Sequence, residues 1–447
     1  MTVRGSWRPG RRVVTLACLV LAPAMLTGFL LSACGGGPAH VSLRVSPRSS
    51  LMDSPLDIRV SGLERGERAQ VRVASTDARG VSWEAAATYR ADREGVIDTA
   101  ADRSMRGSYR GVVRMGLIMA MRPPPATARE AVYVPRPTGP MRFLFTVRAG
   151  GRLLASRTVL RSTVRPGVRF SPETLARTGF EGLWMTPSHA VRGTAVLLFG
   201  GSEGGGQNGS LLQAQLASHG FPTLQVAYFD APGLPPNLEA IPLEYFARAL
   251  TWMTRQPQVN PRRIYVMSGS YGTEAALLLA VHYPSLVHGV VASSPGDVAT
   301  TGLTAFSAEG GFKACHCAAW TYQGRPVPTS YQFNNATPTD VPDAVIPVEQ
   351  IHGPVLTDCG GFDQVWGSCL FGHQIQSRLD GAHDPYPHPF YRYPDAGHGV
   401  DALVPYDPGL SLAAAVDAFN VGGRTPLANA IADAILWPKI LSFLSGS

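Results

Sequence analysis

The sequence predicts two folded domains of different class: an antiparallel β-sandwich, followed by a mostly parallel β-sheet with helices on both faces. Three observations lead to this prediction. Residues 40–164 consist of short runs in which apolar and polar residues alternate, without a helical period. Residues 194–393 instead alternate apolar strands with helical segments. Within them, one strand passes directly into a helix through residues 268–272 (SGSYG), a turn made almost entirely of small residues.

The composition is that of a globular protein with ample core material. Of the 447 residues, 45% are hydrophobic and 16% are charged, a balance that excludes a disordered chain. This length accommodates two domains and a targeting segment.

Residues 1–33 are predicted to be a targeting segment. Four arginines precede an apolar run over residues 13–31, and a small-residue pair leads into Cys34. This arrangement resembles the bacterial lipoprotein signal, in which the cysteine becomes the lipidated N-terminus after cleavage. The alternative is an uncleaved membrane anchor, because the apolar run is long enough to span a bilayer. In either case we expect an exported protein that is tethered to the outer face of the cell membrane.

The net charge of the mature chain argues against nucleic acid as a partner. Cleavage before Cys34 removes four arginines and no acid, which leaves 35 basic and 32 acidic residues and a net charge of +3. A chain this close to neutral offers no general attraction to a polyanion.

Four cysteines remain for the folded domains once Cys18 is cleaved off and Cys34 is lipidated. An even number in an oxidising compartment predicts two disulfides. A bridge within the Cys-His-Cys sequence is expected to be strained, so each of its cysteines is expected to pair with one of the two later cysteines. The rival interpretation is a metal site. The sequence has no two-plus-two zinc spacing, so no metal is expected. The cysteines are Cys315, Cys317, Cys359 and Cys369, and the histidines considered with them are His316, His352, His373, His383 and His388.

The sandwich is predicted over residues 34–166 and is expected to be of immunoglobulin-like type. Ile58 and Val60 alternate with charged neighbours, and Gly150-Gly151 is a two-residue hairpin turn before another strand. The methionine-rich run over residues 115–121 is expected to pack inside the domain rather than to touch a lipid-like ligand.

The parallel sheet is predicted within residues 167–447. Strand–helix alternation of this kind supplies the crossover connections that parallel strands need. An irregular insertion over residues 300–345 is expected to form a lid over the active site. The expected strands are residues 194–199, 223–227, 264–266, 287–292, 353–357 and 390–393, and the expected helices are residues 210–218, 243–254 and 275–280.

The turn at residues 268–272 predicts a nucleophile. A strand that reverses into a helix within a few residues brings backbones close together, which explains the small residues around Ser270. The usual pattern begins with glycine, where this chain has Ser268, which is still small. The glycine-rich loop after the strand at 194–199 does not fit a dinucleotide site and is better suited to an oxyanion hole.

An acid and a histidine follow Ser270 in the order typical of α/β-hydrolases, each in a loop after a strand. A serine hydroxyl becomes a nucleophile when an imidazole takes its proton, and a carboxylate fixes the tautomer of that imidazole. His398 is the candidate base. Asp363 is the favoured acid, because the glycine pair before it lets the chain swing toward the histidine, and Asp358 and Asp395 are the competing acids.

The oxyanion hole is expected to consist of backbone N–H groups. One donor is the N–H of Tyr271, directly after the nucleophile, and the other is that of Ser202 or Glu203 in the glycine-rich loop. Glu274, one helical turn past Ser270, is a candidate for orienting the loops from beneath, although a plain helix residue needs no such role.

Segments spread over nearly the whole mature chain resemble one known family. They include GSY at 107–109, MGL at 115–117, AYF at 227–229, PGLP at 232–235, IPLEYF at 241–246, SGSYGTE at 268–274, IPVE at 346–349, GPVL at 353–356, FDQVW at 362–366, AGH at 396–398, GGRTP at 422–426 and WPK at 437–439. The family is that of acyl-CoA thioesterases and bile acid-CoA:amino acid N-acyltransferase (BAAT). The resemblance implies an immunoglobulin-like domain joined to an α/β-hydrolase domain. It also implies Ser270, Asp363 and His398 as the catalytic triad, with Asp363 rather than Asp358 as the acid.

Two departures from the family pattern bear on the reaction. The acyltransferase branch carries cysteine where Ser270 stands, and a serine acyl-enzyme is an oxygen ester that water hydrolyses readily, which favours hydrolysis over transfer. Similar thioesterases often place a basic residue directly after the serine, where this chain has Tyr271. Since acyl-CoA is a cytoplasmic metabolite and this chain is expected to be exported, the acyl-thioester bond is expected to be shared while CoA is not.

The sequence therefore predicts a membrane-tethered serine hydrolase that cleaves an acyl thioester or ester through an acyl-enzyme, without a cofactor. One alternative is an acyltransferase that passes the acyl group to an amine or alcohol, which requires a lid that excludes water. The other is a non-catalytic envelope binding protein built on a hydrolase fold.

Overall fold

The computed structural model describes residues 40–124, 132–189, 192–307, 311–408 and 421–446, and the side chains of residues 305–307 and 311–312 are not described. The predicted targeting segment and Cys34 lie outside the described residues. Among the helices that are described, none has the length and apolar character needed to cross a membrane.

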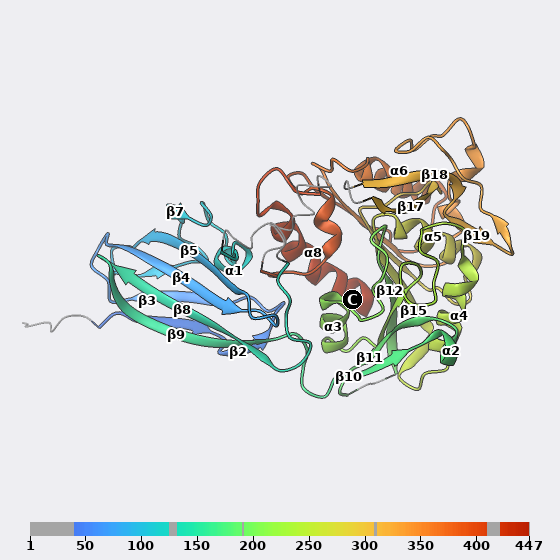
Figure 1. The fold of residues 1–447 in the computed structure, drawn as a ribbon. Coiled ribbons are helices and arrows are strands. Elements are labelled where there is room, and N and C mark those ends of the chain that lie inside the picture. The colour runs from blue at the N-terminus through green and yellow to red at the C-terminus, as the bar shows by residue number, and fades with distance from the viewer. Residues whose placement is uncertain (1–39, 125–131, 190–191, 308–310, 409–420, 447) are drawn as a thin grey trace, which may run out of the picture. The chain divides into compact units, whose positions relative to one another are not determined.

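The N-terminal region forms two sheets that share one core (Figure 1). The strand orders are β1-β3-β6 and β2-β9-β8-β4-β5-β7, and every pair is antiparallel except β2 with β9. Alternate side chains are buried along β8, which places one face of that strand in the core. This arrangement agrees with the predicted sandwich, and its immunoglobulin-like type stays a prediction. The strands are β1 (Ser42–Ser46), β2 (Ser49–Leu51), β3 (Asp57–Ser61), β4 (Arg68–Thr76), β5 (Ser82–Arg90), β6 (Ile97–Asp98), β7 (Arg106–Gly107), β8 (Pro140–Ala149) and β9 (Arg152–Ser162).

The methionine-rich run lies inside this first domain, as predicted. It contains the short helix α1 (Gly116–Met119), whose residues are all buried. Met115 and Met121 belong to the same core as Trp83 and Phe143. No part of the run is available to a ligand at the surface.

The C-terminal region contains an eight-stranded sheet in the order β10-β11-β13-β12-β15-β16-β21-β22. Strand β11 is antiparallel to both of its neighbours, β10 and β13, and all neighbours from β13 to β22 are parallel. This order and direction are those of the α/β-hydrolase fold, so the predicted fold class is confirmed. The strands are β10 (Arg169–Glu173), β11 (Glu181–Thr186), β12 (Gly193–Phe199), β13 (Thr223–Ala227), β15 (Val259–Gly269), β16 (Val290–Ser293), β21 (Val355–Gly360) and β22 (Phe390–Tyr393).

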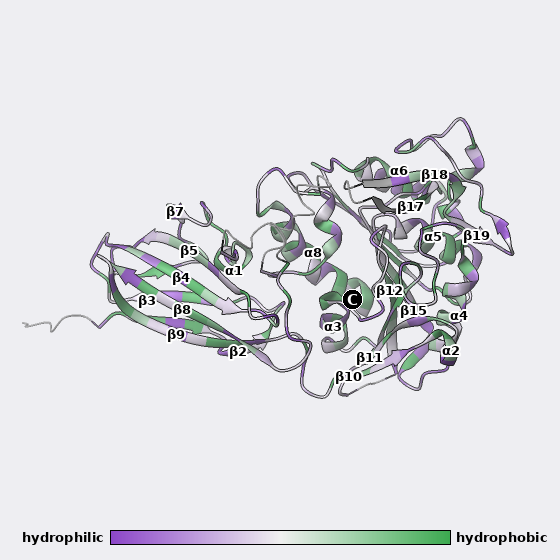
Figure 2. Ribbon diagram, viewed as in Figure 1, coloured by the Kyte–Doolittle hydropathy of each residue, from purple (hydrophilic) through white to green (hydrophobic). Residues whose placement is uncertain are grey.

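Both faces of the parallel sheet are covered by helices, and the central strands are therefore largely apolar (Figure 2). In β12, Leu197 and Phe199 face the core that includes α4 and α5, whereas Val196 and Leu198 face the core that includes α8. The predicted helix at residues 243–254 is confirmed as α4. The helices are α2 (Leu175–Thr178), α3 (Leu211–Ser218), α4 (Leu243–Thr254), α5 (Gly272–His282), α6 (Ser368–Gly381) and α8 (Ala428–Ser445).

The insertion at residues 300–345 is more regular than predicted. It begins with an antiparallel hairpin, in which Leu303 pairs with Ala314. Many residues of this hairpin are only partly buried, so the alternation of apolar and polar residues that marks a strand is weak there. Its elements are β17 (Thr301–Ser307), β18 (Gly311–Ala318), β19 (Trp320–Tyr322), β20 (Arg325–Pro326) and the 3-10 turn η2 (Pro342–Ala344), and β14 (Ile241–Pro242) pairs with β19. Two further 3-10 turns follow the insertion, η3 (Val348–Gln350) and η4 (His398–Ala402).

The expected disulfide pairing is wrong. Cys315 bonds to Cys317 and Cys359 bonds to Cys369, each across a Cα–Cα distance of 5.2 Å. Residues two apart on a strand share one face, so the two cysteines of β18 lie beside each other. The other bridge joins the end of β21 to the first turn of α6, which packs on that strand. Among the described residues, no group of three or more His, Cys, Asp or Glu is arranged to hold a metal ion.

Candidate active site

Ser270 stands at the sharp turn between β15 and α5, in the left-handed region of backbone space with a φ of 53°. The residues around it must be small because the backbones are in close contact. A Cβ atom on Gly272 would lie 2.2 Å from the carbonyl oxygen of Gly200, so no larger residue fits there. Ser268 is tolerated in place of the usual glycine, and its hydroxyl donates to the Phe199 carbonyl at 2.9 Å.

The three residues that the sequence predicts as a triad lie together. His398 Nε2 is 2.8 Å from Ser270 Oγ, and His398 Nδ1 is 2.8 Å from Asp363 Oδ2. The side chains of His398 and Asp363 are only 5% and 4% exposed. The residues follow β15, β21 and β22, whose carboxyl ends meet at one edge of the sheet. This geometry allows the imidazole to take the serine proton while the carboxylate stabilises the resulting charge.

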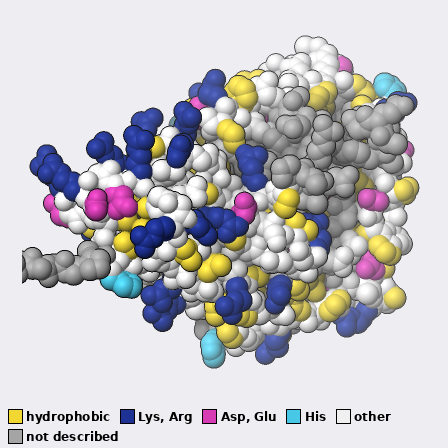
Figure 3. All heavy atoms as spheres, turned by 60° about the vertical axis from the view of Figure 1, so that its left-hand side comes forward, with side chains coloured by type: hydrophobic (Ala, Val, Ile, Leu, Met, Phe, Trp, Pro, Cys, Tyr) yellow, Lys and Arg dark blue, Asp and Glu magenta, His cyan; other side chains and the backbone are white. Residues whose placement is uncertain are grey.

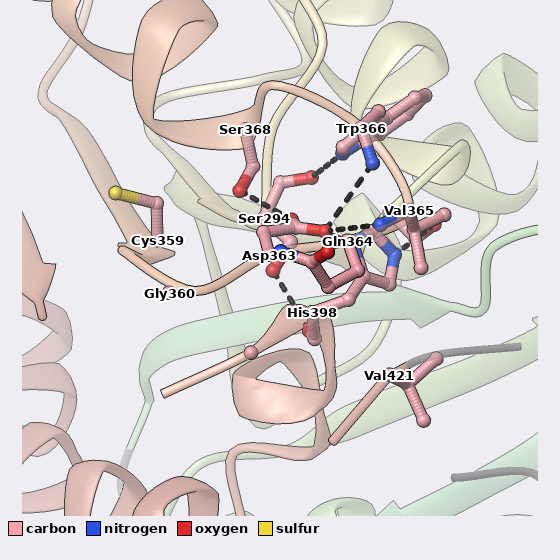
Figure 4. A network of polar contacts seen from close by, with 12 residues as sticks. Ser294, Cys359, Gly360, Asp363, Gln364, Val365, Trp366, Ser368, His398 and Val421 are labelled. Atoms are coloured by element: carbon pink, nitrogen blue, oxygen red, sulfur yellow. Dashed lines mark hydrogen bonds and ion pairs between the residues drawn. The ribbon is translucent and has the colours of Figure 1, made fainter. Parts of the chain in front are cut away.

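The Asp363 carboxylate is held by its own loop (Figure 4). Its Oδ1 accepts from the backbone N–H groups of Val365 and Trp366 at 2.9 and 3.2 Å, and its Oδ2 accepts from Ser368 Oγ at 2.5 Å. The Trp366 ring lies edge-on to His398, with the ring centres 5.8 Å apart. These contacts fix the direction from which the carboxylate reaches the imidazole.

The two competing acids have other partners. Asp358 lies within β21 and accepts from Ser293 Oγ at 2.7 Å. Asp395 is exposed and accepts from Arg424 at 3.0 Å. Strand ends therefore bring several acids near the site, but only Asp363 is bonded to His398.

Surrounding carboxylates make His398 a stronger base than an ordinary histidine. Burial alone would lower its pKa, but the hydrogen bond to Asp363 and the charges of Asp401, Asp363 and Glu203 outweigh burial and raise it. The imidazole is therefore more ready to accept the proton of Ser270.

The residues expected to form the oxyanion hole border Ser270. Within the described part of the chain, the backbone N–H groups of Tyr271 and Ser202 have no hydrogen-bond partner, so both are available. The N–H of Gly201 is taken, since it donates to Glu203 Oε2 at 2.8 Å. The Tyr271 side chain points away, where its hydroxyl donates to the Thr301 carbonyl oxygen and its ring stacks on Trp366.

Two further carboxylates beside the triad were missed by the sequence prediction. The sequence predicts a role in the oxyanion hole for the backbone N–H of Glu203. In the structure its side-chain carboxylate accepts from the Gly201 N–H and so fixes the glycine-rich loop. Asp401 packs against Gly269, where an added Cβ atom would lie 2.9 Å from the Asp401 Cβ. Desolvation by neighbouring protein groups raises the pKa of each carboxylate, although Asp401 is only half-buried and Glu203 is exposed at the cavity. The only signal for Asp401 was its closeness in sequence to His398.

A cavity of about 570 Å³ opens directly onto Ser270 and His398. Apart from these two and the carboxylates of Glu203 and Asp401, its described wall is mostly apolar. The insertion at residues 300–345 supplies part of that wall. The apolar lining residues are Leu303, Ala314, Phe333, Val365, Trp366 and Val421.

Glu274 connects the helix that follows the nucleophile to the insertion. Its fully buried carboxylate accepts from Thr300 N at 3.1 Å, from Thr300 Oγ1 at 2.7 Å and from Trp320 Nε1 at 2.8 Å. Burial raises the pKa of Glu274 to about 7, although these hydrogen bonds favour the charged form. The role beneath the loops that the sequence suggested for Glu274 thus has a structural basis.

Relative to the native protein, the variant Glu274→Gln is expected to become more stable as the pH rises. The folded pKa of Glu274 exceeds its unfolded value of about 4.5, so folding takes up a proton between these values and stability falls as the pH rises through them. Glutamine stays neutral and keeps an acceptor for Trp320. The free energy of unfolding of Glu274→Gln, relative to the native protein, should therefore increase by about 3 kcal/mol between about pH 5 and about pH 8.

Chemical denaturation at both pH values measures this difference. Glu274→Ala is the control, because it leaves Trp320 and Thr300 without an acceptor and should destabilise the protein at both pH values. Parallel pH profiles for the native protein and Glu274→Gln would contradict the raised pKa.

Comparison with known proteins identifies relatives across the chain. A family model described as "Acyl-CoA thioester hydrolase/BAAT N-terminal region" matches residues 53–174, and one described as "BAAT / Acyl-CoA thioester hydrolase C terminal" matches residues 241–447. Acyl-coenzyme A thioesterase 6 of Mus musculus is 29% identical over 419 residues, covering 90% of this chain and 96% of the relative. Acyl-coenzyme A thioesterase 1 of Rattus norvegicus is 29% identical over 438 residues, covering 91% and 96%.

Solved structures are less similar. An α/β-hydrolase enzyme from a deep-sea metagenome library is 14% identical, covers 63% of this chain and all of its own, and has a TM-score of 0.38.

Proposed function

Because this chain belongs to the acyl-CoA thioester hydrolase/BAAT family, we propose that it is a serine hydrolase that cleaves an acyl thioester or ester through a covalent acyl-enzyme. The observation that supports this most directly is the hydrogen-bonded series from Ser270 through His398 to Asp363, with both distances at 2.8 Å. The series ends at the mouth of an apolar cavity.

In the proposed reaction, Ser270 Oγ attacks the acyl carbon while His398 Nε2 takes the hydroxyl proton. The N–H groups of Tyr271 and Ser202 stabilise the oxyanion that forms on the acyl oxygen. The carbon–sulfur or carbon–oxygen bond then breaks, and His398 returns its proton to the leaving thiol or alcohol. A water molecule attacks the acyl-enzyme with His398 as base, which releases the carboxylic acid and restores Ser270.

The cavity supports an apolar acyl group as the part of the substrate that the protein binds. Leu303, Phe333 and Trp366 line the space next to Ser270, and a chain of methylene groups gains about 0.8 kcal/mol for each one buried there. The relatives are named for acyl-coenzyme A thioesters. We propose that this chain cleaves an acyl thioester, or an oxygen ester that reacts by the same steps.

Labelling with a fluorophosphonate probe and a substrate panel test this proposal together. The native protein should be labelled at Ser270, and it should hydrolyse both nitrophenyl esters and acyl thioesters of graded chain length. Acyl-CoA and the matching acyl-N-acetylcysteamine thioester differ only in the leaving group, so their ratio reports whether CoA is recognised. Absence of labelling would point to a binding protein, and a product acylated on added glycine would point to an acyltransferase instead.

A further inference from the structure

The near-neutral net charge of the chain conceals a strong separation of charge. Residues 40–166 contain 22 arginines and 11 acids, whereas residues 167–447 contain 13 basic residues and 21 acids. The N-terminal domain therefore carries a net charge of +11 and the rest of the mature chain −8. Figure 3, in which the side of the N-terminal sheets comes forward, shows basic side chains outnumbering acidic ones on that face. The net charge of +3 for the whole mature chain therefore does not exclude attraction between the N-terminal domain and a polyanion.

Much of this charge lies on the outer face of the larger sheet of that domain. Side chains alternate across a strand, and the register of β4, β5 and β8 places every second residue on the outside. Glu84 is the only acid at an outward position of these three strands, and it pairs with Arg72. We call this surface the basic face, and its arginines are Arg68, Arg72, Arg90, Arg142 and Arg148.

Apart from Arg72, the arginines of the basic face are not balanced by neighbouring acids. Among the described residues, Arg68, Arg90 and Arg142 form no ion pair, and Arg148 donates only to the Gly151 carbonyl, at 3.1 Å. Arg68 and Arg90 are directly opposite each other across β4 and β5. Like charges in opposed positions destabilise a sheet, so an external anion would relieve a repulsion built into this face.

Exposed leucines lie among these arginines. Leu144 is 41% exposed between Arg142 and Arg148 on β8, and Leu153, opposite Arg148, is 54% exposed. Leucines next to arginines are suited to the boundary between lipid headgroups and acyl chains, where both kinds of side chain are stabilised.

The chain enters the domain close to the basic face. The His40 carbonyl oxygen would lie 2.7 Å from a Cβ atom on Gly62, and the Arg90 guanidinium 3.2 Å from one on Gly66. One short loop thus joins the entry point of the chain to Arg90. Cys34, the predicted lipidation site, lies six residues before His40.

We propose that the basic face is a docking surface for an anionic lipid bilayer. Each arginine near such a surface contributes electrostatic attraction that falls off within a Debye length, and exposed leucines add apolar contact. The proposal does not depend on the hydrolase activity.

Vesicle co-sedimentation tests the proposal on residues 35–447, which include the compact unit His40–Ser447 and lack the predicted lipid anchor. Binding is expected to vesicles with about 30% phosphatidylglycerol but not to pure phosphatidylcholine, and it should be lost at about 0.5 M salt. The combined variant Arg68→Gln, Arg90→Gln, Arg142→Gln and Arg148→Gln should bind roughly 600-fold more weakly, since each of the four charges is worth about fivefold.

A second combined variant removes the same charge elsewhere. Arg255→Gln, Arg262→Gln, Arg325→Gln and Arg392→Gln change four exposed arginines of the C-terminal domain and should keep binding within about threefold. Equal loss in both variants, salt-insensitive binding, or equal binding to both lipids would overturn the proposal. Equally tight binding to a DNA duplex at the same salt would show a general polyanion surface and would overturn the assignment to lipid. Hydrolysis of a soluble ester by the first variant confirms that it is folded.

Discussion

Ser270→Ala is expected to lower kcat/KM for an acyl thioester by roughly 10⁴- to 10⁶-fold, because the bond-forming atom is removed. The residual rate would come from substrate binding and oxyanion stabilisation alone. Labelling by a fluorophosphonate should disappear at the same time. Alanine fits the crowded turn as serine does, so the melting temperature should change little. The measurements are steady-state kinetics on one acyl thioester and one nitrophenyl ester, with a thermal melt of each protein.

Ser377→Ala is the matched control, since Ser377 is an exposed residue of α6. Its kinetics should match those of the native protein. If Ser270→Ala kept more than about 1% of native activity in a preparation free of other esterases, another nucleophile would be at work and the proposed mechanism would fail.

Asp363→Asn is expected to lower kcat/KM by roughly 10³- to 10⁴-fold near neutral pH. An amide at this position no longer stabilises the imidazolium, and it favours the wrong tautomer of His398. The pH profile should change as well. Asp363 contributes to the raised pKa of His398, and His398 must be neutral to accept a proton, so the acid limb of kcat/KM should move to lower pH in the variant.

Asp358→Asn tests the competing acid, which the resemblance to the family sets aside in favour of Asp363. Burial raises the pKa of Asp358 well above its ordinary value and so disfavours its charged form, and an asparagine keeps an oxygen that can accept from Ser293 Oγ. Its activity should stay within about threefold of native. Comparable losses in the two variants, with equal melting temperatures, would show that Asp358 shares the catalytic role and would contradict the assignment.

The parallel sheet and its nucleophile were predictable because local sequence patterns encode them. The apolar strand before Ser270 and the helix after it differ in period, and only small residues fit the turn between them. Helix α4 matched its predicted bounds because its apolar positions lie on one face. In the first domain, the alternation of apolar and polar residues along β8 made the sandwich predictable.

Other features were hidden because they depend on contacts between distant segments. The hairpin of β17 and β18 is partly exposed, so its alternation of apolar and polar residues is weak and the sequence predicts an irregular insertion there. Asp401 matters because tertiary folding places it against Gly269. By contrast, both disulfides join cysteines that are neighbours in sequence, two and ten residues apart, and the expectation that the shorter bridge is strained led to the wrong pairing.

The amino-acid order alone thus established the fold class, the candidate nucleophile and the order of the triad residues, since each leaves a short-range pattern. How the cysteines pair, which groups hold the Asp363 carboxylate and where the arginines gather were settled by folding. The physical reason is that hydrogen bonds, disulfides and electrostatic fields depend on distance in space, and strand register sets those distances.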